Sequence, residues 1–178
     1  MKNSIVFVGG IHGVGKSTIC KELASTYGLD YLSASEVLQW EKLNDDHTNK
    51  KVNDISETQK RLINGLQRIV NKNKTYILDG HYCLFDKLGQ IQPIPVEVFS
   101  QIAPISLILI LGDIADIKGR IEARDNVNYS YAQLETMQER EHDHANFLSH
   151  KLNIPLVIVK ATDYTILKQT ISQITAAR

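Results

Sequence analysis

The sequence alternates short apolar runs with longer amphipathic stretches. Five runs have the length and the β-branched content of strands: residues 4–8, 31–33, 75–79, 105–111 and 155–159. Five stretches carry apolar residues at helical spacing: residues 16–27, 56–71, 114–123, 131–152 and 164–176. This alternation is typical of βα units, so the sequence predicts an α/β protein with a parallel sheet and helices on both faces.

The run at residues 105–111, ISLILIL, is apolar at nearly every position. A strand covered by helices on both faces has this pattern, so we expect it near the centre of the sheet. Three polar stretches interrupt the alternation, at residues 43–59, 88–97 and 123–131. Long irregular segments in compact domains are usually functional or disordered, so we expect these three to be mobile covers of a site.

Composition limits the class of protein. The 178 residues are expected to form one domain, residues 1–178, with a sizeable core. Hydrophobic residues make up 43% and charged residues 22%, which are ordinary globular values. Twenty basic and twenty acidic residues cancel, so we expect no general nucleic-acid binding.

The cysteines and the apolar stretches bear on the compartment. Cys20 and Cys83 lie far apart without zinc-type partners nearby, so we interpret them as buried or inert thiols. No stretch approaches the roughly 20 apolar residues of a membrane-spanning helix, and the N-terminal apolar run is too short for a signal peptide. We therefore expect a cytoplasmic protein without membrane contact.

The glycine-rich segment that follows the first strand is a candidate binding site. Residues 10–17, GIHGVGKS, fit the pattern G-x-x-x-x-G-K-[ST] between a strand and a helix. Backbone amides there can surround a phosphate at a helix N-terminus, with Lys16 on the β- and γ-phosphates and Ser17 on Mg²⁺. The expected binding residues for ATP are Gly10, His12, Gly13, Val14, Gly15, Lys16, Ser17 and Thr18.

Two other classes of nucleotide-binding protein fit less well. A GTPase should add an N-K-x-D motif, but residues 71–74 read NKNK, and the DKLG at residues 86–89 follows no predicted strand. A large ring-forming ATPase needs more chain after the third strand. A small phosphotransferase remains.

At this point the residues resemble the P-loop kinases of the adenylate kinase type, especially the archaeal-type and atypical nuclear adenylate kinases. The stretch YILDGHYCL is similar to their Asp-x-His strand, which places Asp79 and His81 in the site. At the carboxyl end of a strand, Asp79 is suited to hold Mg²⁺ through a bound water, or the incoming nucleophile. IKGRIEARD is similar to their lid helix, where Arg120 and Arg124 would face the transferring phosphoryl group. LETMQEREHDHA is similar to the following helix and adds Gln138 and Glu141 as candidates of second rank.

The resemblance also implies an architecture and a set of ligands. It implies a three-layer fold with five parallel strands in the order 2-3-1-4-5, an acceptor-binding excursion at residues 34–72 and a lid at residues 120–131. ATP and Mg²⁺ are the implied cofactors, and a nucleoside monophosphate is the implied acceptor.

One stretch departs from the family pattern. LSASEVLQW is similar to the family's segment after the second strand, but it has Gln39 where classical adenylate kinases use an arginine on the acceptor phosphate. The acceptor candidates in this stretch are Ser33, Ser35, Glu36, Gln39 and Trp40. Nearby cations could replace the arginine or simply be solvated: Lys42, Lys50, Lys51 and Arg61.

Several candidates keep a structural alternative. The two arginines can instead stabilise a surface helix end, His81 can be a loop histidine, His12 can shape its loop, and Trp40 can pack rather than stack on a base. Histidines 142, 144 and 150 lack the spacing of a helical zinc pair. Glu141 falls on an apolar stripe and needs a partner, and we expect a lid arginine.

These observations predict an enzyme that moves the γ-phosphoryl group of Mg-ATP to a nucleoside monophosphate or a similar small nucleotide. Two alternatives stay open. The acceptor can be a nucleoside or a non-nucleotide metabolite, as Gln39 permits. The protein can also be a slow ATPase switch that acts through a protein partner.

Overall fold

The computed structural model describes residues 4–44, 55–71, 73–86, 88–126 and 128–176. Five parallel strands form one sheet in the order β2-β3-β1-β6-β7. Their bounds are Ser4–Gly9 (β1), Asp30–Ser33 (β2), Thr75–Asp79 (β3), Ser106–Leu111 (β6) and Leu156–Lys160 (β7). This is the predicted order 2-3-1-4-5, since β4 and β5 form a separate hairpin.

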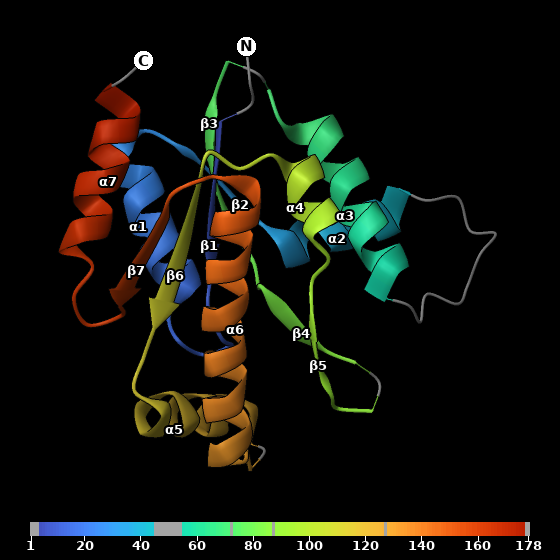
Figure 1. Ribbon diagram of the computed structural model, residues 1–178, viewed down its shortest axis with the longest axis vertical. Helices are drawn as coiled ribbons and strands as arrows, with labels where there is room; N and C mark the ends of the chain where they lie inside the picture. The colour runs from blue at the N-terminus through green and yellow to red at the C-terminus, as the bar shows by residue number, and fades with distance from the viewer. Residues whose placement is uncertain (1–3, 45–54, 72, 87, 127, 177–178) are drawn as a thin grey trace.

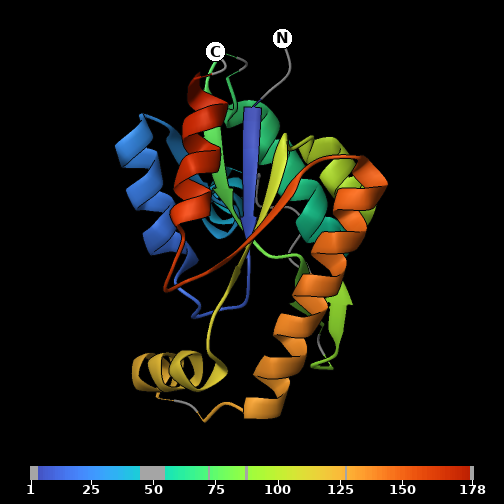
Figure 2. The same cartoon turned by 60° about the vertical axis from the view of Figure 1, so that its left-hand side comes forward.

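Helices cover both faces of the sheet, so the predicted three-layer fold is confirmed. Figures 1 and 2 show α1 and α7 on one face and α3, α4 and α6 on the other. The bounds are Lys16–Tyr27 (α1), Ile55–Ile69 (α3), Val96–Ile102 (α4), Tyr131–Leu152 (α6) and Thr165–Ala176 (α7). The predicted strands and helices begin and end within about two residues of these bounds.

Side-chain alternation along the strands divides the core into two halves. On β1, Val6 and Val8 point into the half beneath α1 and α7, whereas Ile5 and Phe7 point into the half beneath α3, α4 and α6. The same alternation holds along β6, where residues 107–110 are fully buried. Helices on both faces therefore explain why β6 lacks polar positions.

Helix α5, Ile114–Asp125, lies beyond the carboxyl ends of the strands, beside the N-terminal end of α6 (Figure 1). Its N-cap is Asp113, whose side chain accepts from the Asp116 amide at 3.1 Å. The helix ends at Asn126, which adopts a left-handed conformation with φ 53°. Helix α6 then starts after the Ser130 cap, so the segment we expected as a lid is mostly helical.

Four elements were not predicted, and one of them is helix α4. Helix α2, Ala34–Asn44, packs on α3, and the hairpin of β4, Cys83–Phe85, with β5, Ile91–Pro93, precedes α4. The polar stretch at 88–97 is thus part of a hairpin and the start of a helix. Lys50 and Lys51 lie outside the described residues, as do the side chains of Trp40 and Lys42. Within the described chain, no helix is long and apolar enough to cross a membrane.

Candidate active site

The glycine-rich loop of residues 10–15 lies at the carboxyl end of β1 and leads into α1. Parallel pairing places Val8 opposite Asp79 at the end of β3, and Asp79 opposite Ser33 at the end of β2. Three strand ends therefore meet beside the loop. Ligands of open α/β sheets bind at this edge, so the predicted loop and Asp79 share one site.

Two glycines are required by the shape of the loop. Gly13 has φ 82°, and a Cβ at this position would lie 2.2 Å from Cγ2 of Ile121 on α5. Gly15 has φ 103° and caps α1, with open space where a side chain would stand. At Gly13 the loop thus packs closely on α5. At Gly15, where the loop meets the N-terminus of α1, backbone N–H groups lack helical partners and there is room for a phosphate. Val14 of the loop is buried, whereas Thr18, in the first turn of α1, is exposed.

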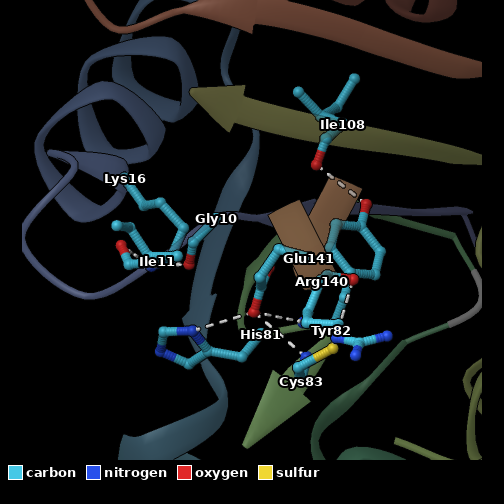
Figure 3. A network of polar contacts seen from close by, with 9 residues as sticks. All are labelled: Gly10, Ile11, Lys16, His81, Tyr82, Cys83, Ile108, Arg140 and Glu141. Carbon is cyan, nitrogen blue, oxygen red and sulfur yellow. Dashed lines mark hydrogen bonds and ion pairs between the residues drawn. The ribbon is translucent and has the colours of Figure 1, made fainter. Parts of the chain in front are cut away.

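Lys16 is turned back onto this loop. Its Nζ donates to the carbonyl oxygens of Gly10 at 2.7 Å and of Ile11 at 3.2 Å, and only 7% of the residue is exposed (Figure 3). Burial lowers the pKa of Lys16, while the carboxylates of Asp79 and Glu141 act in the opposite direction. The ammonium group is therefore held beside the loop in a setting that favours an anionic partner.

Ser17 and Asp79 form a direct polar contact beside the glycine-rich loop. The Ser17 hydroxyl donates to Oδ2 of Asp79 at 2.5 Å, and the Tyr31 hydroxyl donates to the same oxygen at 3.2 Å. Burial, followed by the nearby Asp79 charge, raises the pKa of Tyr31 to about 12. A hydroxyl and a buried carboxylate are hard oxygen ligands of the kind Mg²⁺ prefers, so these residues fit the predicted metal position.

Glu141 and His81 meet at the turn that follows β3. Glu141 is fully buried, and its Oε1 accepts from the backbone amides of Tyr82 at 3.0 Å and Cys83 at 3.1 Å (Figure 3). Nδ1 of His81 is 3.5 Å from the same oxygen. The expectation that Glu141 pairs with a lid arginine is therefore wrong. The buried face of α6 points at the turn after β3, whose amides supply the partners.

The two predicted lid arginines differ in position. Arg124 contacts Nε2 of His12 through Nη2, and it binds Asp125 with its Nε at 2.5 Å and Nη2 at 2.7 Å. Burial, then the Arg124 charge, lowers the pKa of His12. Arg120 is exposed, and its Nε donates to the Asp116 carbonyl of its own helix at 3.2 Å. The structure thus brings Arg124 to the glycine-rich loop, while the hydrogen bond of Arg120 stays within α5.

Gln138 has a positional role. Its side-chain amide exchanges two hydrogen bonds with the backbone of Gly112, at 2.9 Å to the N–H and 3.0 Å to the carbonyl. Gly112 directly follows β6, so Gln138 ties α6 to the point where the chain enters α5. The described residues contain no group of three or more histidine, cysteine or acidic side chains that could hold a metal.

A cavity of about 180 Å³ opens beside His81, between the sheet and helices α2, α3 and α4. Most of its wall is apolar, and its described lining includes Ser35, Gln59, Gly80 and His81. Of the predicted acceptor residues, Ser35 lines the cavity and shares a 2.8 Å hydrogen bond with Ser33. Glu36 and Gln39 are exposed, and Arg61 is half-buried.

Sequence reasoning missed two residues of this region. The sequence predicts Tyr31 only as a strand residue; in the structure it is the second residue of β2 and pairs with Ile77, two residues before Asp79. Gln59 lies on α3, 4% exposed, with its Oε1 buried and without a hydrogen-bond partner among the described residues. No local pattern distinguishes it from the other polar residues of that helix.

A parallel sheet in this order, a glycine-rich loop entering α1 and a carboxylate at the end of β3 define a P-loop nucleotide-binding protein. Residues 9–138 match the family described as AAA domain. A cytidylate kinase of Sulfurisphaera tokodaii is 30% identical over 152 residues, which cover 82% of this chain and 76% of that protein. Human adenylate kinase isoenzyme 1 is 29% identical over 89 residues, which cover 45% of this chain and 46% of that protein.

A solved structure from Chloroflexus aurantiacus, described provisionally as a kinase, superposes with a TM-score of 0.62 at 17% identity. The superposition covers 97% of this chain and 98% of the Chloroflexus chain. At 17% identity this similarity shows the fold alone. The chain belongs to the AAA domain family and is a P-loop protein of the nucleoside monophosphate kinase-like type. Kinase-like phosphoryl transfer to a nucleotide or small molecule follows from this membership.

Proposed function

We propose that the protein transfers the γ-phosphoryl group of Mg-ATP to a nucleoside monophosphate bound in the cavity beside His81. The observation that carries this proposal is the adjacency of two sites. The Ser17–Asp79 contact lies at the phosphate-binding loop, and the two residues that follow Asp79 line the cavity. A donor on the loop and an acceptor in the cavity would therefore meet at the end of β3.

The donor side uses charge and backbone dipoles. The amides at the start of α1 bind the phosphates, and Lys16 leaves its carbonyl partners to neutralise the β- and γ-phosphate oxygens. Ser17 and Asp79 would hold Mg²⁺, which would supply further positive charge to those oxygens. Arg124 stands next to the loop through His12 and is the arginine better placed to act on the transferring group.

The acceptor side is built from different elements. His81 lines the cavity with its ring held near Glu141, so it can orient the attacking phosphate oxygen. The cytidylate kinase relative supports a nucleoside monophosphate as the acceptor. Gln39 cannot supply the positive charge of an arginine, and this substitution keeps a non-nucleotide acceptor as the second candidate.

The test measures ADP formation from ATP and Mg²⁺ with a panel of ribo- and deoxynucleoside monophosphates, nucleosides and small hydroxylated metabolites. Lys16→Ala and Asp79→Asn should abolish acceptor-dependent turnover, whereas Lys151→Ala, on the exposed surface of α6, should not change it. Stimulation by a nucleoside monophosphate supports the proposal. Stimulation only by a metabolite supports the second candidate.

A third outcome would contradict the kinase proposal. Slow ATP hydrolysis that depends on Lys16 and ignores every acceptor would instead favour a switch that responds to a protein partner. Adding a candidate partner and following the same ADP release would then separate a regulated ATPase from an inactive protein.

A further inference from the structure

Two residues that line the cavity beside His81 have a buried polar atom without a hydrogen-bond partner among the described residues. One is Nδ1 of His81, which lies 3.5 Å from Oε1 of Glu141, and the other belongs to Gln59. Only 4% of Gln59 is exposed. Its Oε1 is buried and has no hydrogen-bond partner among the described residues. Buried polar atoms are nearly always paired in folded proteins, because an unpaired one loses its hydration without compensation. The position therefore indicates a donor that arrives with a ligand.

The surroundings of Gln59 limit which ligand can bring that donor. The cavity wall includes Leu38, Leu62, Val98 and Phe99, and its volume is about 180 Å³. Pockets for whole drug-sized ligands measure roughly 300 to 1,000 Å³, so this one suits a single ring rather than an entire nucleotide. A sugar ring would bury several hydroxyl groups against apolar walls, which is unfavourable. A planar base has apolar faces and a polar edge, and it fits these walls.

The orientation of such a ligand follows from the other lining residues. Gly80 and His81 belong to the same wall and come directly after Asp79. An acceptor whose phosphate lies at the end of β3 would extend its base from there into the apolar part of the cavity. The Oε1 of Gln59, in the same wall, is an unpaired acceptor, so Gln59 can form a hydrogen bond with the polar edge of the base.

We infer that the Gln59 carboxamide pairs with the hydrogen-bonding edge of the acceptor's base and so selects nucleotides over other small phosphates. This inference rests on the proposed function and adds the residue that reads the base. The carboxamide has one acceptor oxygen and two donor hydrogens. Cytosine and adenine each present an amino group next to a ring nitrogen acceptor, which matches that pair.

The experiment compares three nucleotides that differ only in the base with a sugar phosphate that has no base. It measures KM for CMP, AMP and UMP, and the inhibition constant of ribose 5-phosphate against them, in the wild type, Gln59→Leu and Gln67→Leu. Gln67 is the matched control because it is exposed on the same helix. We expect Gln59→Leu to raise KM for the preferred nucleotide about 10- to 100-fold while the inhibition constant of ribose 5-phosphate stays the same.

Stability provides a second readout. Leucine removes an unpaired buried oxygen at similar volume, so the urea midpoint of Gln59→Leu should equal or exceed that of the wild type. An unchanged KM, or an equal weakening of nucleotide and ribose 5-phosphate, overturns the role of Gln59 and leaves the proposed kinase intact. A wild type that phosphorylates no nucleotide overturns the proposed function and this inference together.

Discussion

Replacing Glu141 tests how the turn after β3 is held. The carboxylate is fully buried and accepts the amide protons of Tyr82 and Cys83 at N···O distances of 3.0 and 3.1 Å. Glu141→Leu would leave both donors unpaired, at a cost of about 1 to 3 kcal/mol each. Removing a buried charge is itself favourable and offsets part of this cost, so we expect the free energy of unfolding to fall by about 2 to 4 kcal/mol.

Glu141→Gln is the discriminating companion variant. Its amide oxygen can still accept both protons, and a neutral acceptor weakens each bond by about 1 kcal/mol relative to a charged one. We therefore expect a loss below about 2 kcal/mol. Urea denaturation followed by circular dichroism gives the free energy of unfolding, and Glu139→Gln, on an exposed position of α6, serves as the control. Equal losses for Leu and Gln, or a loss under about 1 kcal/mol for Leu, would refute this reasoning.

The same variant has a consequence for Lys16. Burial lowers the pKa of Lys16, and the Glu141 charge counteracts part of that effect. Glu141→Gln should therefore lower the pKa of Lys16 further, so that Lys16 loses its proton at a lower pH than in the wild type. ATP affinity, measured by calorimetry as pH rises, should then decline at a lower pH in Glu141→Gln, and coincident profiles would argue against the coupling.

Three further predictions concern the lid, the core and the thiols. Arg124→Ala should lower kcat by on the order of 10³-fold, and Arg120→Ala much less, since only Arg124 reaches the loop; equal kcat values for the two variants would contradict this. Tyr82→Phe should lower the free energy of unfolding by about 1 kcal/mol through loss of its 2.9 Å hydrogen bond to a β6 carbonyl, as urea denaturation can measure. Burial raises the pKa of Cys83 to about 12 and also that of Cys20, so neither thiol should react with Ellman's reagent before unfolding.

The sheet could be predicted because its strands are buried on both faces. Such strands are short runs of apolar residues between polar punctuation, and residues 105–111 illustrate this most clearly. The order of the strands came from a resemblance carried by the loop and by the Asp-x-His strand, and the pairing of β1 with β3 and β6 confirms it.

Helix α2 and the β4–β5 hairpin could not be predicted in the same way. Each hairpin strand has three residues, which is too short for an alternation of polar and apolar positions to be visible. Helix α2 has a weakly apolar face and is supported chiefly by packing on α3 and β2. Support of this kind comes from contacts with other elements, so the pattern of residues within α2 does not report it.

The need of Glu141 for a partner could be predicted from the sequence, but the identity of that partner could not. A carboxylate on the buried stripe of α6 needs a partner, and this much followed from the sequence. The choice between a lid arginine and two backbone amides depends on where α6 crosses the end of β3. That crossing is a tertiary feature, and backbone N–H groups carry no signature in the sequence.

The two halves of the proposed site therefore differ in how far they can be inferred. The phosphate-binding half is a single segment, residues 10–17, joined to Asp79 by strand pairing, so a local motif and the sheet order suffice to build it. The acceptor half draws its walls from α2, α3, the turn after β3, and α4. Because no one segment contains it, the cavity and the unpaired oxygen of Gln59 become visible only in three dimensions. The identity of the acceptor should accordingly depend on side chains such as Gln59, which can change without disturbing the loop that binds ATP.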